Sequence, residues 1–129
     1  MPDELEVSAS LGLPRVPESA GHARRFISEF CKASELSEEH CRTAALLTSE
    51  LVTNAVRYGG SRATLEARRP GGVLRVSVED DSPELPEEGL APPFSAESGR
   101  GVMLVDALSA RWGVEARPGG KRVWFELDV

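Results

Sequence analysis

Residues 37–60 read SEEHCRTAALLTSELVTNAVRYGG and predict one long amphipathic helix. Ser37 is a favourable N-cap, two glutamates follow it in the positively polarised first turn, and Gly59-Gly60 ends the helix. At about 100° per residue, the apolar side chains form one broad arc. The arc consists of Cys41, Ala44, Leu47, Leu51, Val52, Ala55 and Tyr58. We therefore expect this helix to cover a hydrophobic core with one face.

The segments before this helix predict a strand and a second helix. Leu5, Val7 and Ala9 alternate with polar residues, which indicates a strand that ends before Leu13-Pro14. Apolar residues over 19–33 recur with helical spacing.

The segments after it predict two hairpins and a third helix. Alternation on either side of 69–72 indicates the first hairpin, and 118–120 turns the second. Gly99-Arg100-Gly101 opens a helix that we expect to carry Trp112 and to end at Gly113. The fold expected for a single domain over 1–129 is α+β, a two-layer sandwich of a mostly antiparallel sheet with helices on one face.

Composition excludes several classes of protein. A chain of 129 residues, 40 % hydrophobic and 28 % charged, is typical of one globular domain. A net charge of −6 argues against nucleic-acid binding, which needs a basic footprint. No apolar run is long enough for a membrane span and the acidic start lacks the basic region of a signal peptide, so the cytoplasm is expected. Cys31 and Cys41 are interpreted as reduced, mostly buried thiols.

Glu50, Asn54 and Arg57 form a polar stripe on the long helix. They lie within about 60° of one another on the helical wheel, beside the apolar arc. One interpretation is an exposed edge with helix-stabilising contacts. The other is a metal and nucleotide site in which Asn54 binds Mg²⁺, Arg57 approaches a phosphate and Glu50 is a general base.

Asp80 is the second unusual residue, because strand periodicity puts it on the apolar face of 74–78. A carboxylate there needs hydrogen-bond donors, either backbone groups of a turn starting at Asp81-Ser82-Pro83 or a ligand such as a purine exocyclic amine. Pro-rich residues 81–98 are expected to form an exposed loop. After the loop, the helix start from Gly99 to Val102 could accept a phosphate, although this pattern alone is a weak signal.

Three motifs, taken in order, resemble those of the GHKL (Bergerat-fold) ATPases. Residues 50–59, 78–83 and 99–108 match the family's N box, adenine box and glycine box. The ending from Trp112 to Leu127 is similar to that of the small stand-alone ATP-binding regulators of actinobacteria related to anti-sigma-factor serine kinases.

This resemblance implies a bound ATP with Mg²⁺. Asp80 would bind adenine, Asn54 the metal, and Glu50 would activate a serine of a partner protein. The other nucleotide-binding residues implied are Arg57, Ser82, Gly99, Arg100, Gly101 and Val102. The 81–98 loop would be a lid. A sigma factor or an anti-sigma-factor antagonist is the implied partner, homodimerisation is inferred from the related kinases, and phosphotransfer to an internal histidine is not expected.

Two departures from the family pattern leave alternatives open. Asp80-Asp81-Ser82-Pro83-Glu84 lacks the glycines that many relatives have there, and Arg122 stands where a threonine often follows Gly-Gly-Lys. The leading interpretation is a protein serine/threonine kinase. A non-catalytic ATP-binding partner-switching module and a structural domain without a ligand are the two alternatives.

Overall fold

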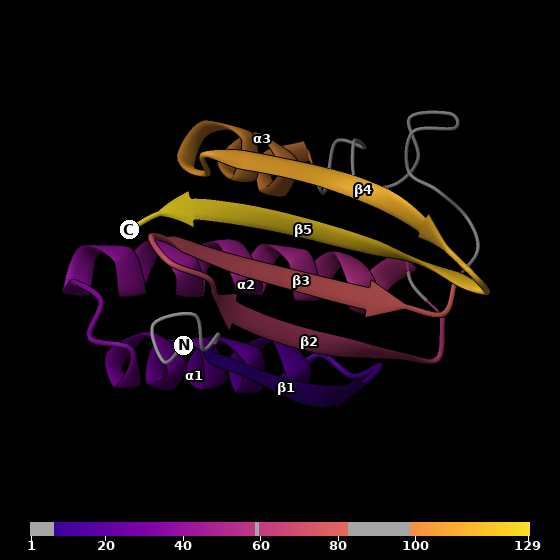
Figure 1. Ribbon diagram of the computed structural model, residues 1–129. Helices are drawn as coiled ribbons and strands as arrows, with labels where there is room; N and C mark the ends of the chain where they lie inside the picture. Colours follow the sequence, from indigo (N-terminus) through magenta and orange to yellow (C-terminus); the bar gives the residue numbers. More distant parts are fainter. Residues whose placement is uncertain (1–6, 59, 83–98) are drawn as a thin grey trace.

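The computed structural model describes residues 7–58, 60–82 and 99–129, which form five strands and three helices (Figure 1). In chain order they are β1 (Val7–Pro14), α1 (Glu18–Ala33), α2 (Glu38–Tyr58), β2 (Arg62–Arg69), β3 (Val73–Asp80), α3 (Gly99–Leu108), β4 (Arg111–Arg117) and β5 (Gly120–Asp128). The strands form one sheet in the order β1-β2-β3-β5-β4, and every neighbouring pair is antiparallel. The predicted α+β fold is confirmed.

The helices lie on one face of the sheet, behind it in Figure 1. α2 packs against β2, β3 and β5, whereas α1 covers β1 and β2, and α3 contacts α2 and β4. The largest fully buried side chains between the layers include Ile27, Leu47, Leu65, Leu74 and Phe125. Alternate residues of each central strand therefore supply the core, as period-2 patterning requires.

The long helix begins and ends as its sequence predicts. The backbone N–H of His40 donates to the Oγ of Ser37 at 3.0 Å, which is the expected N-cap bond. The hairpin that follows turns through Gly71, whose φ of 64° is a conformation that glycine adopts without strain. Of the predicted apolar arc, Cys41, Ala44, Leu47, Leu51 and Val52 are buried. No helix in the described part of the chain is both long and apolar enough to span a membrane.

Two predicted boundaries are wrong. β1 does not end before Leu13 but continues through Pro14, which pairs with Arg62 at the sheet edge, and Leu13 is buried. The third helix ends at Leu108, so Trp112 and Gly113 belong to β4.

The early end of α3 follows from pairing with β5. The backbone N–H of Ala110 donates to the carbonyl of Glu126 at 2.8 Å, which draws the chain into the sheet. Gly113 lies opposite Trp124, and a Cβ on Gly113 would be 2.9 Å from its ring. The sequence pattern could not reveal this change. Leu108 and Trp112 are four residues apart, and this spacing fits a continuing helix as well as a helix that ends between them.

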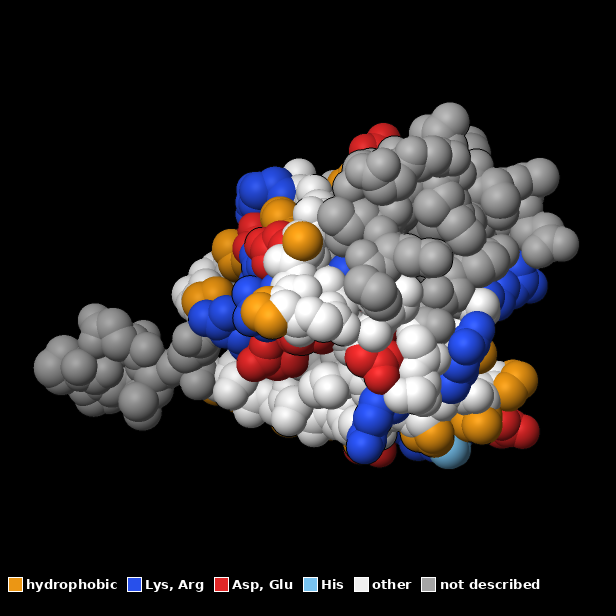
Figure 2. Space-filling model, turned by 90° about the vertical axis from the view of Figure 1, so that its right-hand side faces the viewer, with side chains coloured by type: hydrophobic (Ala, Val, Ile, Leu, Met, Phe, Trp, Pro, Cys, Tyr) orange, Lys and Arg blue, Asp and Glu red, His pale blue; other side chains and the backbone are white. Residues whose placement is uncertain are grey.

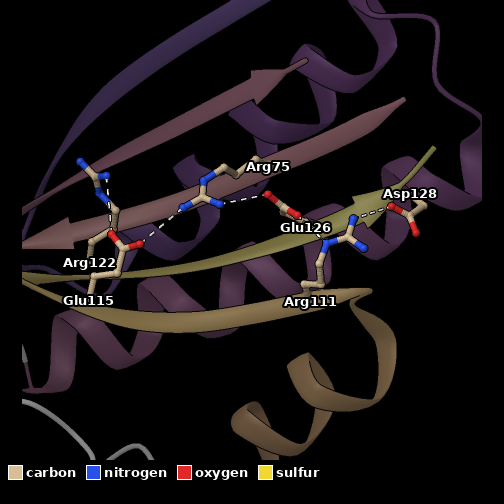
Figure 3. Close-up of polar contacts among 6 residues, drawn as sticks. All are labelled: Arg75, Arg111, Glu115, Arg122, Glu126 and Asp128. Carbon is tan, nitrogen blue, oxygen red and sulfur yellow. Dashed lines mark hydrogen bonds and ion pairs between the residues drawn. The ribbon is translucent and has the colours of Figure 1, made fainter. Parts of the chain in front are cut away.

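The other face of the sheet carries a network of charged side chains (Figure 3). Glu126 on β5 accepts from Arg75 at 3.0 Å and from Arg111 at 2.7 Å, and the Arg75 guanidinium lies 4.3 Å from the centroid of the Trp124 ring. These contacts join β3, β4 and β5 on that face, and the arginines lower the pKa of the Glu126 carboxyl.

Arg122 belongs to this network rather than to the helical face. It lies opposite Glu79 in the β3–β5 register and donates to that carboxylate at 3.0 Å. A threonine hydroxyl at position 122 would therefore point away from Asp80, because consecutive strand residues point to opposite faces.

Candidate functional site

Three segments that are distant in the sequence meet at one end of the sheet. β2 begins just after α2, and Ala63 of β2 pairs with Asp80, the last residue of β3. Asp80 also pairs with Lys121 at the start of β5. In Figure 1 this is the right-hand end, and Figure 2 looks onto it, where acidic and basic side chains are interspersed on the described residues. The topology therefore brings the end of the long helix to the predicted adenine-binding carboxylate.

The polar stripe of α2 lies on the side of the helix away from α1. A groove of about 770 Å³ lies between α1 and α2, and Cys41, Arg42 and Ala45 line it from the α2 side. Asn54 is nine residues after Ala45, which is about 180° around the helix. Asn54 and Glu50 are half-buried, while Arg57 is exposed. The stripe is thus a separate surface from the groove.

The last turn of α2 is fixed by a residue that the sequence did not single out. Arg15, in the connection between β1 and α1, donates from Nε to the carbonyl of Val56 at 2.6 Å and from a terminal nitrogen to that of Arg57 at 2.7 Å. Carbonyls in the last turn of a helix have no partner within the helix, and a cation there also matches the helix dipole. Arg15 therefore holds the turn that carries Arg57 in place.

Asp80 is buried and has two partners among the described residues. It is 6 % exposed, and its Oδ1 accepts from the backbone N–H of Ser82 at 2.9 Å. Nζ of Lys121 lies 3.1 Å from each carboxylate oxygen. The predicted turn contact is therefore present, together with an ion pair that the sequence analysis missed. Alternation from Phe125 through Val123 to Lys121 would have placed that lysine on the helical face.

Two glycines allow the chain to pass close to this end of β3. A Cβ on Gly120 would lie 2.0 Å from the carbonyl oxygen of Asp80, and one on Gly60 would lie 1.9 Å from Oδ1 of Asp81. Real Cβ atoms are not found at such separations from other heavy atoms. Glycine at both positions is required for Asp80 and Asp81 to sit where they do.

Asp81 ties the start of β2 to the end of β3. Its carboxylate accepts from the backbone N–H of Ser61 at 2.7 Å and from the Ser61 hydroxyl at 2.6 Å. These bonds stabilise the charged form, and the hydroxyl makes the largest contribution to lowering the pKa of the Asp81 carboxyl. The contact fixes the segment between α2 and Asp80.

The lowered pKa of Asp81 predicts a pH-dependent contribution to stability. Because the folded-state pKa lies below the unfolded value of about 3.9, the contribution is complete above about pH 5 and is lost as the pH falls through the folded-state value. In urea unfolding between pH 7 and pH 3, Asp81→Asn should be less stable than the wild type at pH 7. The difference should shrink toward pH 3.

A companion variant tests the cause of that shift. Ser61→Ala removes the hydroxyl donor and so raises the folded-state pKa of Asp81 toward the unfolded value; the loss of stability on acidification should be smaller than in the wild type and should level off at a higher pH. Parallel stability curves for the wild type and Asp81→Asn over the whole range would contradict the assignment.

The phosphate-binding prediction falls on the first turn of α3. Gly99, Arg100, Gly101 and Val102 form this turn, as predicted, and the first N–H groups of a helix have no partner within it. Residues 83–98 of the predicted lid lie outside the described residues, whereas Ser82 is described and buried.

The described residues are better suited to a cation that binds together with a nucleotide than to a metal that protein side chains hold by themselves. They contain no group of three or more His, Cys, Asp or Glu side chains that could hold a metal. Mg²⁺ typically takes one or two protein oxygens together with substrate phosphates and water. The half-buried Asn54 amide is an oxygen donor of the required kind.

A model of the histidine kinase-like ATPase domain matches residues 13–127. The chain belongs to this family. Membership of an ATPase family implies that it binds ATP, and the GHKL resemblance of its three motifs is thereby confirmed. An uncharacterized protein of Streptomyces coelicolor is 37 % identical over 73 residues, which are 54 % of this chain and 70 % of that protein.

Solved structures share the fold of this histidine kinase-like ATPase domain. The RsbU and RsbW domains of Rv1364c from Mycobacterium tuberculosis superpose with a TM-score of 0.70 at 17 % identity, covering 95 % of this chain and 32 % of that one. The SiaB–SiaC complex from Pseudomonas aeruginosa gives 0.65 at 13 % identity, covering 94 % and 89 %. A histidine kinase domain from Erythrobacter litoralis gives 0.60 at 25 % identity, covering 89 % and 61 %. The chain thus spans about a third of the Mycobacterium chain.

Proposed function

We propose that the protein is an ATP-dependent serine/threonine kinase of the anti-sigma type, which phosphorylates an antagonist protein and binds a sigma factor. The observation that carries the proposal is the placement of Glu50 one helical turn before Asn54, on the side of α2 away from α1, within an ATPase domain. A carboxylate beside a nucleotide site can position and deprotonate an acceptor hydroxyl.

Each residue of the proposed site has a distinct role. Asp80 accepts from the exocyclic amine of adenine, while Asn54 supplies an oxygen to Mg²⁺, which neutralises phosphate charge when the nucleotide is bound. Arg57 or Arg100 supplies positive charge to the phosphates, and the first turn of α3 adds backbone N–H donors and the positive end of its dipole. Ser82 holds the Asp80 carboxylate through its backbone N–H.

The proposed reaction is an in-line transfer of the γ-phosphoryl group. The hydroxyl oxygen of a partner serine forms a bond to the γ-phosphorus, and its proton passes to the Glu50 carboxylate. The bond between the γ-phosphorus and the β–γ bridging oxygen breaks, and ADP leaves with that electron pair. The products are ADP and a phosphoserine on the partner.

The partner assignment draws on the solved structures that share this fold. One of them holds an RsbW domain, and another is a complex of two proteins, SiaB and SiaC. We therefore propose a protein partner, and a homodimer, for this chain. The net charge of −6 gives no support to a direct nucleic-acid partner.

The test separates nucleotide binding from phosphotransfer. At saturating Mg²⁺, ATP at about 100 times its Kd should stabilise the protein by about 2.7 kcal/mol. Proteins captured with the tagged chain should then be labelled on serine or threonine by γ-labelled ATP, with the acceptor mapped by mass spectrometry. Absence of any ATP-induced stabilisation would overturn the whole proposal.

A second function, a non-catalytic ATP-binding module, is favoured by one observation. Ser82 and Glu84 stand where many relatives have glycines, which is a departure from the family pattern beside the nucleotide site. In that case ATP would only change the affinity for a partner, which requires different ATP affinities in two conformational states. ATP binding with ATP-dependent partner capture and no label transfer would select this function.

A further inference from the structure

Lys121 and Asp80 form a buried pair with hydrogen-bonding capacity left on both members. Their side chains are 8 % and 3 % exposed, and Nζ of Lys121 lies 3.1 Å from each carboxylate oxygen. An ammonium has three N–H donors, and Lys121 donates one of them to Oδ1 of this carboxylate. Among the described residues no other acceptor bonds to Lys121, so a donor remains for a ligand.

Asp80 also has hydrogen-bond acceptor capacity left. Among contacts between described residues, Oδ1 accepts from Lys121 and from the backbone N–H of Ser82, whereas Oδ2 lies 3.1 Å from Nζ of Lys121 in the ion pair. A carboxylate oxygen accepts about two hydrogen bonds, so Oδ2 retains one position. The pair therefore presents one acceptor and one donor side by side.

The backbone around the pair holds it in a fixed position. Asp80 and Lys121 are directly opposite each other in the β3–β5 ladder. Gly120 brings β5 against the Asp80 carbonyl, at a separation that no side chain at position 120 would permit. Both side chains face the helical layer, on the same face as Val78 and Phe125. Groups held this firmly can discriminate between ligands that differ by a single atom.

We infer that Lys121 is a specificity-determining residue of the base site, which donates to ring nitrogen N1 of adenine while Asp80 accepts from the 6-amino group. Adenine carries a donor at the 6-amino group and an acceptor at the adjacent N1, which is the complement of the pair. This inference rests on the proposed ATP site. A base with a 6-oxo group and a protonated N1, such as hypoxanthine, would place an acceptor against Asp80 and a donor against Lys121.

The test uses nucleotides in which a single ring nitrogen is replaced by a C–H group. In titration calorimetry with Mg²⁺, wild-type protein should bind 1-deaza-ATP, which lacks the N1 acceptor, about ten- to a hundredfold more weakly than ATP. It should bind 7-deaza-ATP, which keeps both groups, with an affinity close to that of ATP. This matched control separates the loss of N1 from a general intolerance of deaza-purines.

A protein variant completes the experiment. Lys121→Met keeps the length of the side chain but has no donor, so its affinity ratio between ATP and 1-deaza-ATP should fall to near one. If Lys121 had only a structural role, Lys121→Met would bind ATP and 1-deaza-ATP more weakly by the same factor, and the wild-type affinity ratio would be kept. Equal binding of ATP and 1-deaza-ATP by the wild type would overturn the inference while leaving ATP binding intact. Absence of binding by either nucleotide would instead overturn the proposed ATP site and this inference with it.

Discussion

Glu50→Gln is expected to lower the rate of phosphotransfer to the partner serine by about 10²–10⁴-fold while leaving ATP binding unchanged. Glutamine has nearly the same size but cannot take the proton of the acceptor hydroxyl. Because this proton moves only during the reaction, the loss falls on the rate constant rather than on nucleotide affinity. Label transfer at saturating Mg-ATP measures the first quantity, and calorimetric titration measures the second.

Glu39→Gln is the matched control for this experiment. Glu39 lies on the same helix in its exposed first turn, so it reports any general effect of removing a carboxylate from α2. It should transfer phosphate at the wild-type rate. Glu50 makes contacts of its own, so melting temperatures of both variants are needed to exclude a loss of fold. Wild-type transfer by well-folded Glu50→Gln would refute its role as the base.

Local patterning made most of the fold predictable from the sequence. The spacing of apolar residues, the Ser37 cap and the Gly71 turn each belong to a few consecutive residues, and each is found as expected. Failures occurred where long-range pairing decides the outcome. Trp112 continues a helical pattern by spacing, but the hydrogen bond between Ala110 and Glu126 commits that segment to the sheet.

The same distinction applies to the site. Asp80 was singled out because strand periodicity alone puts its charge on the buried face, and it is buried. Its partner, Lys121, lies 41 positions away in the sequence, and the pairing depends on the register of β3 with β5. Arg15 was missed for the same reason, since nothing local connects it with the last carbonyls of α2. The positions of Glu50 and Asn54 relative to each other could be predicted, because both follow from the periodicity of one helix.

Breaking the ion pair between Asp80 and Lys121 is expected to produce the largest change in stability. Asp80→Leu leaves a buried ammonium without its counterion, and Lys121→Met leaves a buried carboxylate that keeps, among the described residues, the Ser82 N–H as its donor. Each single variant should lose about 3–5 kcal/mol of unfolding free energy, because an uncompensated charge is left in the interior. Urea unfolding at pH 7 measures these losses.

The double variant distinguishes a buried pair from two independent contacts. Asp80→Leu/Lys121→Met removes both charges and replaces them with apolar side chains of similar volume, so it should be more stable than either single variant and approach the wild type. Additive losses would show that the two charges do not depend on each other in the folded protein. A near-neutral double variant that no longer binds ATP would instead show that the pair contributes little net stability, and that its two charges are retained at this position for the ligand.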